Sequence, residues 1–306
     1  MALNKSMKRL WVLLGIAVFA LAPTIESSAQ PLASTLNLYA QVNTFGDAEI
    51  KWTPGMPAHQ AKPIVTIRFD YDLGDKPGRS QPKKYDFAAG KAVFTDLSLD
   101  SRYVFEVTIS IGHQPIQDRR FVVITPKPRR QPTGNSAVDR QLAYVDAHWL
   151  TRENSKYMYI PSFDCANFAS QTLVARGLPQ NWSWQQINKV PTHSFISATA
   201  LRAYLLTRPS VKELAANQVS KVKLGDLALF DWDRSGDTDH VGVVNYIERR
   251  PDGTVKVFIA QHTMHRYYRS VDWAVQVNHP GARMTYLSLP LTDSAFNWSS
   301  LFDVAH

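Results

Sequence analysis

The sequence predicts an α+β domain in the C-terminal part of the chain, preceded by an all-β sandwich. From about residue 35 to 125, short segments alternate apolar and polar residues and are separated by turns rich in Gly, Pro and Asp. From residue 136 onward, helical patterns come first and strand patterns follow, an order typical of α+β domains. Residues 126–135, rich in Pro and Arg, have the composition of an extended linker. We therefore expect domains at 30–125 and 136–306.

Residues 1–29 have the features of a cleaved signal peptide. A positively charged start is followed by an apolar run, Leu10 to Leu21, and then by Ser27-Ser28-Ala29, small residues of the kind a signal peptidase reads. The apolar run is shorter than the roughly 20 residues that a membrane-spanning helix needs. We therefore expect cleavage before Gln30, export to the periplasm or the medium, and no transmembrane segment in the mature protein.

The charge of the chain bears on its partners. The formal net charge is +8, and the excess Lys and Arg residues are scattered along the chain. Scattered positive charge is typical of solvated faces, and it also favours attraction to an anionic cell-envelope surface. Because an export signal is present, we do not expect nucleic acid as a partner.

The predicted sandwich contains five clear strand patterns, at residues 48–52, 64–69, 92–94, 103–111 and 120–124. Trp52 lies in an early strand, and the run Leu97-Ser98-Leu99-Asp100-Ser101-Arg102-Tyr103 leads into a late one. These two features resemble a fibronectin type III module, whose core Trp and tyrosine corner occupy such places. The resemblance implies a module that binds or spaces, and no constellation in it suggests chemistry.

The candidate nucleophile is Cys165, the only cysteine of the chain. Asp164 before it, a helical pattern through Phe168 and Leu173, and Gly177 after it predict an amphipathic helix with an N-cap and a glycine stop. The unpaired N–H groups and the dipole at a helix start favour thiolate, and an N–H there could also stabilise an oxyanion. A buried structural thiol is the alternative. We favour the nucleophile, because an unpaired Cys is a liability in an oxidising compartment.

Other helices and strands are expected around Cys165. Asn135-Ser136 begins a helix that runs to about residue 149, and a further helix covers about 197–206. Strand patterns follow at 224–230, 240–247 and 254–262, the last two joined by the turn signal Pro251-Asp252-Gly253.

Four motifs occur in order: Asp164-Cys165-Ala166-Asn167-Phe168-Ala169-Ser170-Gln171, Gly225-Asp226-Leu227, Asp231-Trp232-Asp233 leading into Asp239-His240-Val241, and Gln261-His262-Thr263. Together they resemble the bacterial putative amidase domain family, which is usually placed among papain-like cysteine hydrolases beside NlpC-type and CHAP-type cell-wall peptidases. The resemblance implies a papain-like fold, Cys165 as nucleophile and His240 as general base and acid. Ala166 and Phe195 depart from the family's common Thr and Trp.

The residue that orients the imidazole of His240 is left open by the sequence. His262 is the first choice, because the resemblance places a histidine at the end of this strand. Gln261 is its rival, since neighbours on a strand face opposite ways and only one can point at His240. Asn245 is a distant third candidate. We expect the other histidines to be surface or core residues; they are His59, His113, His148, His193, His265, His279 and His306.

An acidic loop leads into His240. Asp231, Asp233, Ser235, Asp237 and Asp239 alternate around Gly236. Such spacing can gather oxygens around Ca²⁺, but the Glu that an EF-hand carries at its twelfth position is missing. The alternative is a solvated hairpin turn.

The sequence therefore predicts an exported cysteine amidase or peptidase that cleaves amide bonds with Cys165 and His240 and needs no cofactor. Location and resemblance suggest the stem peptides of peptidoglycan as substrate. Two alternatives remain: an acyl transferase with the same Cys–His pair, and a non-catalytic cell-wall binding or inhibitory protein.

Overall fold

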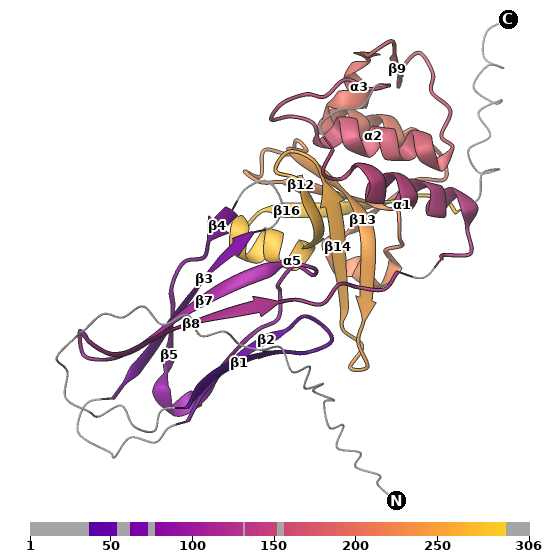
Figure 1. Cartoon of the computed structure of the whole chain (residues 1–306). Coiled ribbons are helices and arrows are strands. Elements are labelled where there is room, and N and C mark those ends of the chain that lie inside the picture. Colours follow the sequence, from indigo (N-terminus) through magenta and orange to yellow (C-terminus); the bar gives the residue numbers. More distant parts are fainter. Residues whose placement is uncertain (1–36, 54–61, 73–76, 131, 152–155, 292–306) are drawn as a thin grey trace, which may run out of the picture. The chain divides into compact units, whose positions relative to one another are not determined.

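A computed structural model describes residues 37–53, 62–72, 77–130, 132–151 and 156–291 (Figure 1). The signal peptide expected at residues 1–29 lies outside this part of the chain and stays a prediction. No helix among the described residues is long and apolar enough to cross a membrane. The chain divides into two compact units, the first ending at Pro126 and the second beginning at Lys127, with Asp72, Pro77 and residues 98–100 grouped with the second.

The first unit is the predicted β-sandwich. Its elements are β1 (Leu38–Val42), β2 (Ala48–Trp52), β3 (Ile64–Asp72), β4 (Pro77–Arg79), β5 (Lys83–Asp86), the 3₁₀ turn η1 (Phe87–Ala89), β6 (Lys91–Phe94), β7 (Arg102–Ile111) and β8 (Gln114–Ile124). One sheet has the order β1-β2-β6, and the other has β4-β3-β7-β8 with β5 also paired to β3. All five strand patterns read from the sequence lie in these strands.

Aromatic side chains fill the space between the two sheets. The ring of Phe94 on β6 lies 5.7 Å from Phe69 on β3 and 4.9 Å from Phe105 on β7, measured between centroids. Trp52 is buried and donates its indole N–H to the carbonyl oxygen of Phe87 at 2.6 Å. A buried Trp with a satisfied N–H contributes both packing area and a fixed orientation to this core. The prediction of an all-β sandwich is confirmed.

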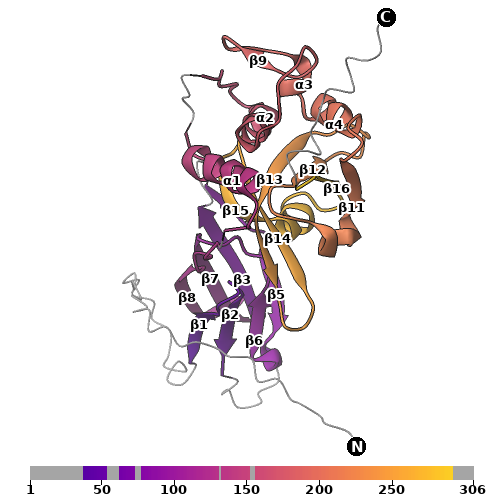
Figure 2. The ribbon, with the colours of Figure 1, turned by 90° about the vertical axis from the view of Figure 1, so that its right-hand side faces the viewer.

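The second unit mixes helices with one six-stranded sheet. Its elements are α1 (Ser136–His148), α2 (Cys165–Arg176), β9 (Gln186–Ile187), β10 (Val190–Pro191), α3 (His193–Ile196), α4 (Ala198–Leu206), β11 (Lys212–Ala215), η2 (Ala216–Lys221), β12 (Leu227–Asp231), β13 (His240–Arg249), β14 (Val255–Gln261), β15 (Arg266–Ser270), α5 (Val271–Trp273), the π turn η3 (Ala274–Asn278) and β16 (Arg283–Ser288). The sheet order is β11-β16-β12-β13-β14-β15, with antiparallel neighbours throughout. In Figure 2, β15 and β11 lie at its two edges.

The expected helices at 136–149 and 197–206 correspond to α1 and α4, and the three expected strands correspond to β12, β13 and β14. Helices therefore precede the main sheet, as predicted, although β11, β15 and β16 were not expected. Their sequences carry many polar and charged residues and lack a clear alternation. The structure thus confirms a mixed helix and sheet domain, and the papain-like affiliation stays a prediction.

The helix that carries the cysteine is more buried than expected. Every residue from Cys165 to Leu173 is buried, because α2 contacts α1, α3, α4, β13 and β14. The helix is therefore not amphipathic over this stretch, contrary to the prediction from the sequence. Gly177 does end the helix in the left-handed conformation, with φ of 116°, as predicted. Such a central helix holds its first residue firmly against the sheet.

The Gly225-Asp226 motif has a packing role in this unit. A Cβ atom at Gly225 would lie 2.4 Å from Oε1 of Gln141 and 2.7 Å from Nη1 of Arg176, both buried, so only glycine fits. The fully buried Asp226 accepts backbone hydrogen bonds from Lys223 at 2.8 Å and Leu289 at 2.9 Å. Burial raises the pKa of this carboxyl to about 6. The motif thus joins α1 and α2 to the loop before β12.

Candidate active site

Cys165 is the first residue of α2, and its side chain lies against the start of β13. The backbone N–H groups of Val241 and Ala166 hydrogen-bond its sulfur, and the side chain is 7% exposed. Val241 directly follows His240 in the chain. The structure therefore brings the predicted nucleophile and the residue beside the predicted base into contact.

The protonation state of the Cys165 sulfur differs from the expectation. Burial raises the pKa of the Cys165 thiol, and the charge of Asp164 raises it further, while the backbone N–H groups of Val241 and Ala166 lower it. We expected the helix start to favour thiolate. The prediction was wrong because removing the sulfur from water penalises the anion more than the donors around it stabilise the charge. Cys165 therefore rests as a thiol.

His240 begins β13 and is 6% exposed. Burial lowers its pKa to about 3, and the positive charge of Arg269 acts in the same direction. A side-chain hydrogen bond with Gln261 acts in the opposite direction. Nε2 of His240 is buried and has no hydrogen-bond partner among the described residues. His240 therefore rests as a neutral imidazole with one ring nitrogen unused, which is the state that a general base requires.

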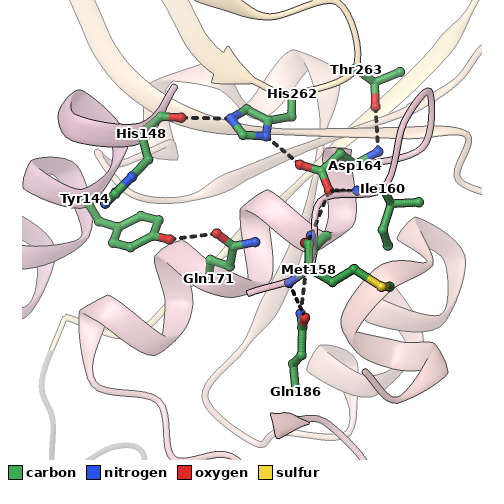
Figure 3. A network of polar contacts seen from close by, with 10 residues as sticks. Tyr144, His148, Met158, Ile160, Asp164, Gln171, Gln186, His262 and Thr263 are labelled. Atoms are coloured by element: carbon green, nitrogen blue, oxygen red, sulfur yellow. Dashed lines mark hydrogen bonds and ion pairs between the residues drawn. The ribbon is translucent and has the colours of Figure 1, made fainter. Parts of the chain in front are cut away.

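Gln261 and His262, the two candidates for orienting His240, lie at the end of β14 and contact different groups. Gln261 interacts with His240, and its Oε1 accepts a hydrogen bond from Nη1 of Arg269 at 3.0 Å. His262 points elsewhere: Nδ1 lies 2.6 Å from Oδ2 of Asp164, and Nε2 lies 2.9 Å from the carbonyl oxygen of His148 (Figure 3). Both ring nitrogens of His262 are thus occupied away from His240. The geometry favours Gln261, and our first choice, His262, does not have the contact that role needs.

Asn245, the third candidate for that role, is fully buried in β13 at a break in its pairing with β14. It does not line the pocket that holds Cys165 and His240, and its amide has no hydrogen-bond partner among the described residues. The geometry gives it no part in orienting His240.

A pocket of about 580 Å³ exposes Cys165, His240 and Gln261 together. Its other walls come from the 162–164 loop, α3, the acidic loop and the residues after β14. They include polar and apolar side chains, among them Ser162, Phe163, His193, Ile196, Trp232, Thr238, Met264, Arg269 and His279. Three catalytic candidates from three separate elements therefore meet at one opening, and His262 lies outside it.

Two histidines that we expected on the surface or in the core, His193 and His279, line this pocket. The ring of His279 stacks on Trp232 with 4.2 Å between centroids, and Trp232 stacks in turn beside His240 at 5.9 Å. Arg269, which sequence reasoning also missed, is only 3% exposed. No motif spacing marked these residues, because they come from segments far from the Cys165 helix in the sequence.

The acidic loop has a structure of its own. Asp231, Asp233 and Asp239 have ligand atoms within 4.8 Å of one another. Each of these carboxylates also accepts a hydrogen bond from a backbone N–H of the loop, namely that of Gly236, Ser235 and Trp232 respectively. Because the loop's own backbone holds these carboxylates, we favour the hairpin turn over the calcium loop.

One comparison with known proteins covers the region that contains the pocket. Residues 135–286 match the family model described as the putative amidase domain. This range contains α1 through β16 up to Tyr286 and includes every residue of the pocket described above. The match suggests, at a coarse level, a hydrolase that acts on amides.

Among curated proteins, the chain is similar to the uncharacterized protein YjcM of Bacillus subtilis (strain 168), with 28% identity over 133 residues. The aligned part is 41% of this chain and 30% of that protein, so the chain spans less than a third of its relative.

Among solved structures, the fibronectin type III domain of human collagen alpha-1(XX) covers 35% of this chain with 18% identity and a TM-score of 0.24, and 94% of that chain is covered. The corresponding domain of human contactin 1 covers 36% of this chain with 13% identity and a TM-score of 0.23, and 95% of that chain is covered. The fold of the first unit rests on its strand pairing and core.

Proposed function

We propose that this protein is a cysteine amidase in which Cys165 attacks an amide carbonyl, His240 transfers the proton, and Gln261 orients His240. One observation carries the proposal: the only cysteine lies in a pocket beside a buried histidine whose Nε2 has no partner among the described residues. A nucleophile next to a base that is held by a third group is the arrangement that acyl transfer through a covalent intermediate requires.

The cycle starts from two neutral groups. Nε2 of His240 accepts the thiol proton as the sulfur of Cys165 attacks the carbonyl carbon, and a tetrahedral oxyanion forms. The C–N bond then breaks, and the imidazolium gives its proton to the leaving amine. Water attacks the resulting thioester while His240 accepts a proton from it. Collapse releases the acid, and the proton returns to the Cys165 sulfur.

Gln261 suits the orienting role because its amide is itself fixed. Arg269 donates a hydrogen bond to Oε1 of Gln261, so this atom is an acceptor. Nε2 of Gln261 donates to the carbonyl oxygens of Thr263 and Met264, both at 3.4 Å. An acceptor facing His240 receives a hydrogen bond from a ring N–H, and this proton is on Nδ1 of His240, because Nε2 of His240 has no partner among the described residues. The remaining lone pair is then on Nε2, as the first proton transfer requires.

The start of α2 supplies donors for the oxyanion. The first N–H groups of a helix have no partner within it, and no side chain caps this helix start. The backbone N–H groups of Cys165 and Ala166 already hydrogen-bond the sulfur, so they lie next to the reacting centre. Donors placed there stabilise the negative charge that develops on the carbonyl oxygen, an effect typically worth about 2.7–4 kcal/mol per donor.

For the substrate, we propose amide bonds in the stem peptides of peptidoglycan. Two expectations support it: export, predicted from residues 1–29, and the resemblance of the four motifs to a family placed beside cell-wall peptidases. A pocket of about 580 Å³ has room for a peptide side chain and its neighbouring amides. The polar wall residues Ser162 and Thr238 offer hydroxyl groups to such a backbone.

The test is hydrolysis of a panel of peptidoglycan stem peptides and simple peptide amides by the purified mature chain, with products identified by mass spectrometry. Cys165→Ala should form no product and His240→Ala should form it far more slowly, while His113→Ala, an exposed histidine of the first unit, should match the wild type. Products joined to an added amine would identify an acyl transferase instead. Equal turnover by Cys165→Ala and the wild type would exclude the proposed nucleophile.

A further inference from the structure

Asp164 and His262 form a buried contact one residue along the chain from the pocket residues Cys165 and Gln261. Oδ2 of Asp164 lies 2.6 Å from Nδ1 of His262, and their side chains are 3% and 4% exposed. The ring of His262 also stacks on Phe168 of α2, with 4.0 Å between centroids and an interplanar angle of 9°. Figure 3 shows the two side chains pointing toward each other between α2 and the end of β14.

The partners of the His262 ring determine its protonation. Nε2 faces the carbonyl oxygen of His148 at 2.9 Å, and Nδ1 faces the carboxylate of Asp164. A carbonyl oxygen and a carboxylate only accept hydrogen bonds, so both ring nitrogens must donate. A ring that donates from both nitrogens is an imidazolium, and the contact is then a charge-assisted ion pair.

Two further histidines lie near the His262 ring. The side chain of His148 on α1 carries a pKa that is lowered by burial and by the positive charge of His262. The ring of His265, in the turn after β14, lies 4.4 Å from that of His262. Asp164 is the acid in direct contact with the His262 ring, so it balances the charge on that ring.

Asp164 also makes several hydrogen bonds to the segments around Cys165. Its Oδ1 accepts hydrogen bonds from the backbone N–H of Ile160 at 2.9 Å and from Nδ2 of Asn167 at 2.7 Å. Its own backbone N–H donates to Oγ1 of Thr263 at 2.8 Å. The carboxylate does not cap α2, although the sequence predicted that it would. Asp164 instead ties the helix start to the end of β14 and leaves the first N–H groups of α2 to the sulfur.

The charge of Asp164 reaches the sulfur as well as the histidine. A carboxylate beside Cys165 opposes ionisation of the thiol and contributes to its raised pKa. A cation on the far side of the same carboxylate offsets that field. The contact between Asp164 and His262 therefore joins the start of α2 to the end of β14, and it also changes the electrostatic field at the Cys165 sulfur.

We infer that Asp164 and His262 form a buried ion pair that positions the Cys165 helix against the end of β14 and neutralises the carboxylate next to the sulfur. His262 is thus a positioning residue that acts through Asp164. The inference relies on the proposed function only in treating Cys165 as the reactive group.

The experiment measures the rate of Cys165 alkylation by iodoacetamide against pH in the full mature chain. In His262→Gln the carboxylate loses its cation, so the midpoint should move to higher pH and alkylation at pH 8 should slow roughly threefold to tenfold. In Asp164→Asn the negative charge is removed, so the midpoint should move to lower pH. The double variant should return close to the wild type, because both charges are gone.

The matched control is His148→Gln, which keeps the carbonyl oxygen that His262 contacts and changes only the side chain. It should leave the alkylation midpoint unchanged. A purely structural role for the pair would give shifts of the same sign, or none, in both single variants, and that result would overturn the inference.

A second measurement observes the protonation of the His262 ring directly. Nitrogen-15 NMR of the histidine rings in the wild-type chain should show one ring protonated on both nitrogens at pH 7 to 8, and this signal should be absent in His262→Gln. A His262 ring that is neutral at that pH would overturn the ion pair. Neither experiment requires turnover, so a chain that hydrolyses no amide would disprove the proposed function and leave this inference standing.

Discussion

The two histidines on either side of the end of β14, His240 and His262, differ in how many of their ring nitrogens have a hydrogen-bond partner. On the pocket side, Gln261 faces His240, whose Nε2 is buried and has no partner among the described residues. On the other side, both nitrogens of His262 make contacts of 2.6 and 2.9 Å. A buried polar atom without a partner costs about 1–3 kcal/mol. We therefore propose that the unsatisfied side is the reactive one and that the satisfied side supports it.

The difference also concerns charge. On the pocket side the proposed nucleophile and the proposed base both rest neutral, because burial raises the pKa of the Cys165 thiol and lowers that of His240. On the support side, Asp164 and His262 lie in direct contact, and we infer that they carry opposite charges. Charges on Cys165 and His240 therefore appear only during the proposed reaction, next to donors that can stabilise them.

The largest expected effect is on the pocket side. Cys165→Ala should abolish amide hydrolysis, a loss of at least about 10³-fold, because no other thiol is present in the chain. The melting temperature should stay close to that of the wild type, because only one buried atom is removed. Hydrolysis and thermal unfolding of the same preparation check this, and substantial residual turnover would count against the account.

The second effect is on proton transfer. His240→Ala should lower kcat by about 10²–10⁴-fold, the usual contribution of a positioned general acid and base. Binding of substrate should change little, so KM should remain near the wild-type value. Steady-state kinetics separate the two parameters, and a change confined to KM would place His240 in binding.

The third prediction compares the neighbours Gln261 and His262. Gln261→Ala should lower kcat by about 10–100-fold, since orientation of the base is lost. It should lower the free energy of unfolding by only about 1–3 kcal/mol, because the buried Arg269 loses an acceptor. His262→Ala should lower the free energy of unfolding by about 3–5 kcal/mol, because it leaves the Asp164 carboxylate buried and unpaired. Denaturant unfolding and kinetics on both variants check the contrast. Interchanged outcomes would restore His262 as the orienting residue.

The fourth prediction concerns stability against pH. His240 has a folded-state pKa of about 3 and an unfolded value near 6.5, so the unfolded chain binds the extra proton between these values. Stability from this group is therefore present above pH 6.5 and falls with decreasing pH, by about 1.4 kcal/mol per unit. Asp226, with its raised pKa of about 6, acts in the opposite direction between about pH 4 and 6.

The wild type and His240→Ala both contain Asp226, so its contribution cancels when their free energies of unfolding are subtracted. The difference therefore reports the contribution of His240. It should change steadily from pH 6.5 toward pH 4. A difference that does not depend on pH would mean that His240 is not buried as a neutral ring.

The smallest expected effect concerns the acidic loop. Because backbone N–H groups already hold Asp231, Asp233 and Asp239, adding calcium or EDTA should leave the melting temperature unchanged. A calcium-dependent rise in melting temperature, lost in Asp233→Asn, would revive the calcium loop.

Much of the fold could be predicted because its signals are local. Alternating residues at 103–111 and 120–124 gave β7 and β8, and Gly177 gave the end of α2. The facing of Gln261 and His262 could not be predicted, because a change of one residue in register reverses every side chain of a strand. The pairing of β14 with β15 indeed shifts between Ile259 and Gln261.

The electrostatics of the site depended on burial, which the sequence does not give directly. The motif Asp164-Cys165 predicted a helix start and hence a favoured thiolate, but the packing around α2 raises the pKa of the thiol. The pocket residues Arg269 and His279 come from β15 and from the turn before β16, and no local pattern links them to Cys165. Long-range packing therefore decided both points.

The most direct test of the proposed Cys–His chemistry is intact-mass analysis of the chain after brief reaction with 4-nitrophenyl acetate and quenching in acid. The account predicts one added acetyl group on Cys165 in the wild type, no adduct in Cys165→Ala, and a much slower adduct in His240→Ala. An acetyl group that forms equally in Cys165→Ala, or elsewhere in the wild type, would contradict the proposed nucleophile.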